Sequence, residues 1–244
     1  MLYAVILFTV FVTSVLSGIL GMAGGMILMA VLVSTLSVAT AMILHGAAQA
    51  TANGSRAWFL RQHINWAILP PYSIGAGIAL AGFTAMTIIP LPGVVLILVG
   101  LFPWAARANI RLRGLNVLKP MTTIVCGGVV TSAQLLAGAS GPLLDVFYLN
   151  APLNRLEIVA NKALTQALGH ILKIIYYALL AGAGIAGELS VVFILLIMSI
   201  SVGGTRVGTW VLERWDDQQF QKISQIIILT IATICVAQGI CLLL

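Results

Sequence analysis

Residues 37–56 read SVATAMILHGAAQATANGSR, and residues 154–173 read NRLEIVANKALTQALGHILK. Most positions in both stretches are small or apolar, but polar side chains recur at every fourth position. Residues spaced by four lie on one face of an α-helix. We therefore predict two helices, each with a polar stripe: His45, Gln49 and Asn53 on the first, and Lys162, Gln166 and His170 on the second.

The offset of 117 residues that aligns these stretches also aligns two glycine-rich motifs, GMAGG at 21–25 and GASGP at 138–142. Ser37 and Asn154 correspond as well, and each can cap the helix that follows it. Glu157 completes an Asn-x-x-Glu capping box in the second copy. This shared register indicates an internal duplication.

The duplication divides the chain into three parts. We predict a first transmembrane repeat at 1–106, a basic cytoplasmic linker at 107–117 and a second transmembrane repeat at 118–244. The stretch at 206–222 breaks the register, and we expect it to form an extra loop.

The composition is that of a membrane protein. Of the 244 residues, 61% are hydrophobic and 7% are charged, and the mean hydropathy is +1.11, which leaves too little polar surface for a soluble domain. The formal net charge of +6 would suggest nucleic acid in a soluble protein. Here most basic residues lie in short loops between apolar runs, so we expect a lipid bilayer and no nucleic acid as the partner.

Apolar runs of about 20 residues are long enough to cross a bilayer. Such segments lie near 1–20, 38–57, 66–84, 88–106, 120–137, 155–179, 188–205 and 221–244. Two shorter apolar pieces, 24–35 and 142–150, follow the glycine motifs, and we interpret them as half-helices of broken or re-entrant segments. The predicted fold class is an all-α polytopic membrane protein with two repeats of about four helical segments each.

The basic loops set the expected topology. The loop with Arg56 and Arg61 and the loop at 107–119 should be cytoplasmic, whereas the loop at 180–187 has no Lys or Arg and should lie outside. The two striped helices then run in opposite directions, and the repeats are inverted. If segments 1–20 and 120–137 both cross fully, the repeats are parallel instead.

The polar stripes predict a binding site. Such groups are costly against lipid, so both stripes should face the interior and meet between the repeats. Helix N-termini at the glycine motifs offer unpaired N–H groups to an anion. We expect a small anionic substrate, with no cofactor, metal or catalytic residue. The predicted substrate-binding residues are Gly24, Gly25, His45, Gln49, Asn53, Ser140, Gly141, Lys162, Gln166 and His170.

Histidine titrates near neutral pH, so the candidates for proton coupling are His45, His170 and the acidic Asp145. The role of Lys162 stays open, because it could pair with Asp145 or Glu157 instead of binding substrate.

Arg56 and Lys173 fall near the ends of the predicted spans. We interpret both as interfacial anchors.

The motifs SGILGMAGGMILMAVL at 17–32 and AGASGPLLDVFYLNAPLNRLEIVANKALTQALGHILKIIYY at 137–177 resemble the duplicated pattern of the sulfite exporter TauE/SafE family. The likeness covers nearly the whole chain, although the first motif lacks the proline that the fuller pattern places after its glycines. The resemblance implies a transporter of sulfite or an organosulfur anion in the cytoplasmic membrane of a bacterium or archaeon.

We therefore expect a secondary transporter that works by alternating access, with proton coupling. A small-anion channel and a carboxylate carrier are the alternatives. The chain has no Walker motif and no G-x-S-x-G motif, which argues against an ATP-driven pump and against an enzyme. The sequence is compatible with a monomer or a homodimer.

Overall fold

A computed structural model describes residues 2–20, 23–108, 115–186, 190–212, 214 and 217–244. Every regular element in these residues is helical, with two 3₁₀ turns at Arg61–His63 and Trp66–Ile68. The α-helices are α1 (Leu2–Leu20), α2 (Ala23–Thr35), α3 (Val38–Phe59), α4 (Leu69–Met86), α5 (Pro92–Ala108), α6 (Pro120–Ala137), α7 (Gly141–Tyr148), α8 (Arg155–Ala186), α9 (Val191–Leu212) and α10 (Asp217–Cys241).

The predicted all-α class is confirmed, and the two short pieces after the glycine motifs form α2 and α7. Two expected loops are wrong. Helix α8 continues through the supposed outer loop to Ala186, and the supposed extra loop at 206–222 is largely the end of α9 and the start of α10. In both places the sequence remains apolar or helix-compatible beyond the length that a bilayer requires, so the helices continue.

Among the described residues, four helices are long and apolar enough to cross a membrane. They are Trp66–Met86, Pro120–Ala137, Arg155–Leu180 and Val191–Val211. The shorter apolar helices are Tyr3–Ile19, Ala23–Thr35, Pro92–Ala108 and Gln225–Cys241. Helix α3 has 22 residues but belongs to neither group, because its polar stripe interrupts the apolar sequence. Most of its residues as far as Asn53 are buried by other helices.

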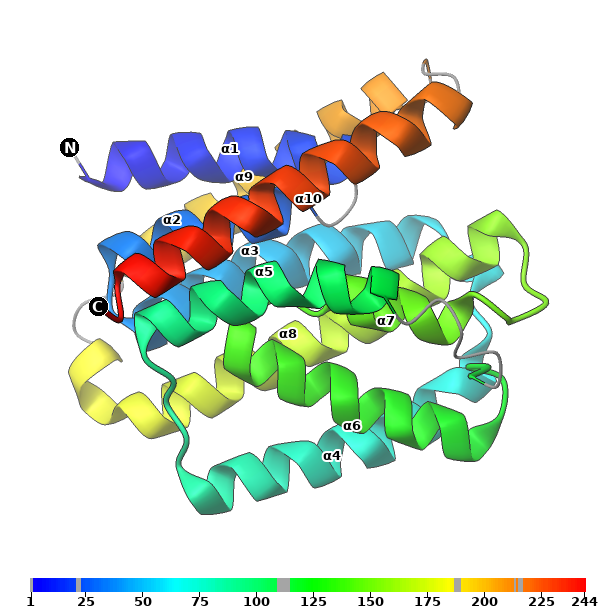
Figure 1. The fold of residues 1–244 in the computed structure, drawn as a ribbon, viewed down its shortest axis with the longest axis horizontal. Helices are drawn as coiled ribbons and strands as arrows, with labels where there is room; N and C mark the ends of the chain where they lie inside the picture. The colour runs from blue at the N-terminus through cyan, green and yellow to red at the C-terminus, as the bar shows by residue number, and fades with distance from the viewer. Residues whose placement is uncertain (1, 21–22, 109–114, 187–189, 213, 215–216) are drawn as a thin grey trace.

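The helices associate in pairs around a central pair, α3 and α8, which pack along each other (Figure 1). On one side α1 packs against α9, on the other α4 packs against α6, and α5 packs against α10. In Figure 1, α3 runs from left to right and α8 from right to left. The polar stripes therefore lie on two antiparallel helices at the centre of the molecule.

Side chains cap both central helices as predicted. The Ser37 hydroxyl accepts a hydrogen bond of 3.3 Å from the Thr40 N–H at the start of α3. At the start of α8, the Asn154 N–H donates to Glu157 Oε2 at 2.8 Å, and the Glu157 N–H donates to Asn154 Oδ1 at 3.0 Å. This reciprocal pair is a complete capping box.

Replacing Asn154 with alanine should lower the free energy of unfolding by about 1 kcal/mol, because the Glu157 N–H loses its acceptor. The thermal midpoint in detergent measures the effect. The neighbouring exposed residue Leu156 supplies the control, and Leu156→Ala should change stability by less than about 0.5 kcal/mol. Equal effects of the two changes would contradict the capping assignment.

Candidate functional site

His45 links the two halves of the molecule. The ring is fully buried in α3, with Nε2 2.9 Å from the Gly25 carbonyl oxygen and Nδ1 2.8 Å from Nζ of Lys173. A carbonyl oxygen can only accept, so Nε2 carries the hydrogen and Nδ1 accepts from the lysine. The imidazole thus bridges the first glycine motif and α8.

Lys173 is the central cation of this cluster. Its side chain has no exposed surface, and Nζ also donates to the Gly138 carbonyl oxygen at 3.0 Å. Gly138 follows α6 with φ of 74°, a left-handed conformation that favours glycine. The carbonyl end of a helix carries partial negative charge, which stabilises a nearby cation. The interpretation of Lys173 as an interfacial anchor is wrong, because α8 extends well past it and surrounding helices bury it.

Arg56 occupies the corresponding place in the first half. It is half-buried, and Nη2 donates to the Ser17 carbonyl oxygen near the end of α1 at 3.3 Å. Arg56 and Lys173 are 117 residues apart. Each therefore places a positive charge near the carbonyl end of the first helix in its own half.

Three buried polar groups of the stripes and the second glycine motif have an atom without a hydrogen-bond partner: Nε2 of Gln49, Nδ1 of His170 and Oγ of Ser140. The Gln49 amide lies against Gly25, where an added Cβ atom would be 3.4 Å from Gln49 Cδ. The His170 ring centroid is 5.5 Å from that of His45. Buried polar groups are normally hydrogen-bonded. These groups therefore mark a place where a polar ligand would find partners.

The other predicted site residues are placed less centrally. Asn53 is buried and donates to the Gln49 carbonyl oxygen of its own helix at 3.0 Å. Gly24 serves close helix packing, since an added Cβ atom would be 1.9 Å from the Thr13 carbonyl oxygen in α1. Gly141 is the buried first residue of α7. Gln166 is partly buried, and its carbonyl oxygen accepts from Gln134 Nε2 at 3.4 Å.

Lys162 forms an ion pair with Asp145 of α7, and its side chain is 25% exposed. Lys162 and Lys173 are eleven positions apart in α8, which corresponds to about 16 Å along a helix. The two lysines therefore occupy different places, one at the centre and one nearer the surface.

Gln134 in α6 is a buried polar residue that the sequence reasoning missed. Its Oε1 has no hydrogen-bond partner, and a Cβ atom added at Gly169 would lie 2.0 Å from that oxygen. The offset of 117 residues places Gln134 on Ser17, whose buried hydroxyl is also without a partner. This correspondence was the available signal, and extending the repeat comparison upstream of the glycine motifs would have found it.

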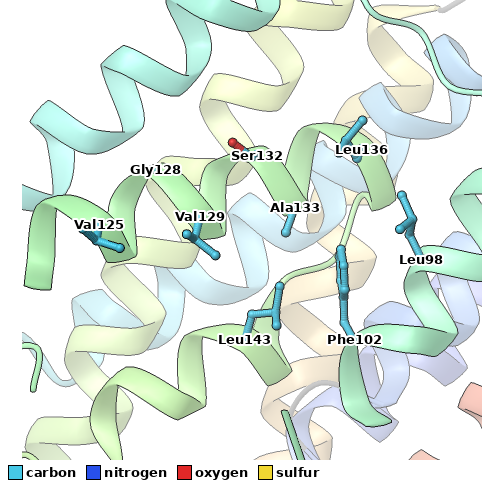
Figure 2. Close-up of a pocket in the computed structure, with 9 residues that line it drawn as sticks. All are labelled: Leu98, Phe102, Val125, Gly128, Val129, Ser132, Ala133, Leu136 and Leu143. Carbon is cyan, nitrogen blue, oxygen red and sulfur yellow. The ribbon is translucent and has the colours of Figure 1, made fainter. Parts of the chain in front are cut away.

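A cavity of about 530 Å³, largely open to the surroundings, lies elsewhere, between α5, α6 and α7 (Figure 2). Figure 2 shows Leu98 and Phe102 of α5 facing Leu136 of α6. Ser132 is the one polar side chain among the nine residues that line the cavity. Such a lining suits hydrocarbon and offers no charge to an anion, so the cavity is not the predicted anion site.

Among the described residues, no group of three His, Cys, Asp or Glu side chains could hold a metal ion.

Comparison with protein families matches the family described as "Sulfite exporter TauE/SafE" over residues 6–234. Searches of curated proteins and of solved structures found no significant match. The family match spans nearly the whole chain and includes both glycine motifs and both polar stripes. The chain therefore belongs to the sulfite exporter TauE/SafE family and is a multi-pass membrane transporter of a small sulfur-containing anion, not an enzyme.

Proposed function

We propose that the protein carries sulfite or a related oxyanion by alternating access, and that the anion binds beside Lys173 between α3 and α8. The buried lysine carries this proposal. An ammonium group has three N–H donors, and two of them are used by His45 and the Gly138 carbonyl. The acidic side chains of Asp145 and Glu157 are engaged elsewhere. A buried cation costs several kcal/mol unless an opposite charge compensates it, and a bound anion does so.

Neutral donors complete the proposed site. Gln49 Nε2 and Ser140 Oγ are buried without partners, and both belong to the region of the two glycine motifs. Sulfite exposes three oxygens, so the lysine and two neutral donors can each take one. Hydrogen bonds to charged groups contribute about 1.5–3 kcal/mol. Lys173 and the unpartnered donors are therefore the groups that we assign to substrate binding, with Lys162 outside the site.

Alternating access follows from two inverted repeats, and the helix packing supports them. Under the offset of 117 residues, α1 corresponds to α6 and α4 to α9. The duplication therefore relates the packed pair α1–α9 to the packed pair α6–α4. In each of the pairs α3–α8 and α5–α10, the two partners correspond to each other, one from each repeat. The antiparallel course of α3 and α8 in Figure 1 favours inverted over parallel repeats. A site on the axis between inverted repeats can open first to one side and then to the other.

The distribution of charge supports the orientation. In Figure 1, α3, α5 and α9 end, and α4, α6, α8 and α10 begin, at the right-hand end of the molecule. Among the described residues, Arg56 and Arg107 lie in the last turns of α3 and α5, and Lys119 and Arg155 lie at the starts of α6 and α8. The sequence at 180–186, at the other end, has no Lys or Arg. We assign the basic end to the cytoplasm of a bacterial or archaeal cell.

We assign proton coupling to the His45–Lys173 pair. The two nitrogens are 2.8 Å apart and can share one proton. His170 of α8 is a second histidine beside the pair, with its ring centroid 5.5 Å from that of His45. When the anion leaves, the full positive charge of the pair is no longer compensated, so release of the anion favours release of a proton. By linkage, the affinity for the anion should rise as the pH falls.

Flux of labelled sulfite into proteoliposomes tests this function. An imposed proton gradient should drive accumulation above equilibrium, which a channel does not support. His45→Gln keeps an acceptor for Lys173 and a donor for Gly25 but removes the titratable ring. We expect this variant to retain sulfite exchange and to lose proton-driven accumulation. Undiminished accumulation by His45→Gln would move coupling to other residues, and absence of any sulfite flux in the unaltered protein would overturn the proposed function.

A further inference from the structure

A second group of buried polar atoms lies away from the central site, in the packing between α4, α6 and α7. Tyr72, Thr131 and Tyr148 each have at most 3% of their surface exposed. Tyr72 and Tyr148 belong to a compact region with apolar neighbours such as Val130, Leu144 and Phe147, and Thr131 follows Val130 in α6. The fold thus encloses three hydroxyl groups in an apolar core.

These hydroxyls are close to one another but are not paired. The Tyr72 hydroxyl lies beside Thr131 and near Cys126 and Tyr148, and Tyr148 lies near Asp145. The Tyr148 hydroxyl also lies beside that of Thr165, which donates to the Asn161 carbonyl oxygen. None of the hydroxyls of Tyr72, Thr131 and Tyr148 reaches the distance and angle of a full hydrogen bond. An unpaired buried hydroxyl costs about 1–3 kcal/mol. The arrangement is unfavourable unless the hydroxyls meet a polar partner during function.

Tyr72, Thr131 and Tyr148 lie between the surface ion pair and the central site. Asp145, near Tyr148, pairs with the partly exposed Lys162 towards the surface. Thr131 is followed one turn later in α6 by Gln134, whose unpartnered oxygen packs against Gly169, the neighbour of His170. Polar groups therefore continue from the surface pair to the central site. Tyr72 is in the first turn of α4 and Tyr148 is the last residue of α7, so the outer part lies towards the basic end of the molecule.

The symmetry-related region, built from α1, α2 and α9, has no tyrosine at these places, and Tyr72 corresponds to Leu189. At an offset of 117 residues, Tyr148 corresponds to Val31 and Asp145 to Leu28. Thr131 corresponds to Ser14, whose hydroxyl donates to Ser201 Oγ at 3.2 Å. Ser17 and Thr205 keep buried hydroxyls without partners in that region, but the two tyrosine hydroxyls are particular to the region of α4, α6 and α7. The repeat does not require them, so their presence needs another explanation.

We propose that Tyr72, Thr131 and Tyr148 line the cytoplasmic access path and form a second, uncharged subsite for the same small oxyanion. This inference rests on the proposed function. Hydroxyl donors can replace part of the hydration shell of an anion, but without a cation they hold it weakly. Weak binding is appropriate in an access path, because the transported anion must both enter and leave it readily. The Lys162–Asp145 ion pair lies at the entrance, where separating the two side chains would open the path.

Cys126 provides a reporter inside this region, since it is buried next to Tyr72 and Tyr148. The other two cysteines, Cys235 and Cys241, are replaced with alanine. A methanethiosulfonate reagent that carries a sulfonate group and cannot cross the bilayer is added to inside-out or right-side-out vesicles. We expect labelling of Cys126 from the cytoplasmic face. Labelling from the opposite face alone, or none from either face in a protein that still transports, would overturn the inference.

Transport kinetics supply a second readout. Tyr72→Phe and Tyr148→Phe remove a hydroxyl while keeping the ring, and each should lower kcat/KM for sulfite about two- to tenfold. The thermal midpoint should not fall, because no hydrogen bond is lost. Tyr3→Phe, at an exposed tyrosine of α1, is the matched control and should change neither quantity. Unchanged kcat/KM in both buried variants would contradict the subsite. If Lys173→Met loses sulfite flux while Tyr72→Phe and Tyr148→Phe keep normal flux, the central binding site is supported and the access path is contradicted.

Discussion

Transport of sulfite should fall by roughly 10- to 150-fold when Lys173 is replaced by methionine, which corresponds to the loss of about 1.5–3 kcal/mol from one charge-assisted interaction. Methionine has a similar length and keeps the buried volume but supplies neither charge nor N–H donors. Removing a buried charge in favour of an apolar side chain is often neutral for stability. Initial rates of labelled sulfite uptake into proteoliposomes, together with the thermal midpoint of the same preparation, measure the two effects separately.

Lys162→Met is the matched control for this experiment, because Lys162 lies on the same helix and its side chain is paired with Asp145 near the surface. We expect a smaller loss of transport from this variant. If Lys162→Met loses more transport than Lys173→Met, the substrate binds at Lys162, as the sequence predicted, and not at Lys173. Full activity of Lys173→Met would remove the central lysine from the mechanism.

Gly75→Ala should destabilise the protein by about 3 kcal/mol or more, since it overfills a contact between two backbones. An added Cβ atom would be 1.9 Å from the Ile124 carbonyl oxygen and 2.8 Å from the Gly128 nitrogen, so α4 and α6 would have to separate. Urea or thermal unfolding in detergent, followed by size-exclusion chromatography, measures the loss.

Gly77, two residues further along α4, is the control because an added Cβ atom there would meet no atom within 4 Å. Gly77→Ala should stabilise the helix by about 0.5–1 kcal/mol, since alanine restricts the unfolded chain more than glycine does. If both variants unfold at the same midpoint, the close contact between α4 and α6 is wrong.

Much of the architecture could be predicted from local patterns. The four-residue spacing of His45, Gln49 and Asn53 predicted a helix whose polar face is buried, because helical periodicity follows from backbone geometry alone. The capping box of Asn154 and Glu157 was predictable for the same reason, since its hydrogen bonds span three residues. The all-α membrane class and the family also followed from composition and motifs.

Helix ends were harder to predict. The sequence placed the end of the α8 segment near 179, and Lys173 therefore seemed to lie near the surface. In the structure α8 reaches Ala186, and Lys173 is surrounded by other helices. Hydropathy gives the length that a bilayer needs, but the protein environment decides how far the helix continues.

The partners of Lys173 could be decided only by tertiary structure. His45 is 128 residues away and Gly138 is 35 residues away, and both reach the lysine because α3, α6 and α8 converge. By itself, the sequence determined where most helices lie and which faces are polar, because periodicity and capping are local, and the resemblance of its motifs indicated the family. Packing decided which lysine is central and which is paired with an aspartate, because those contacts depend on how distant helices cross.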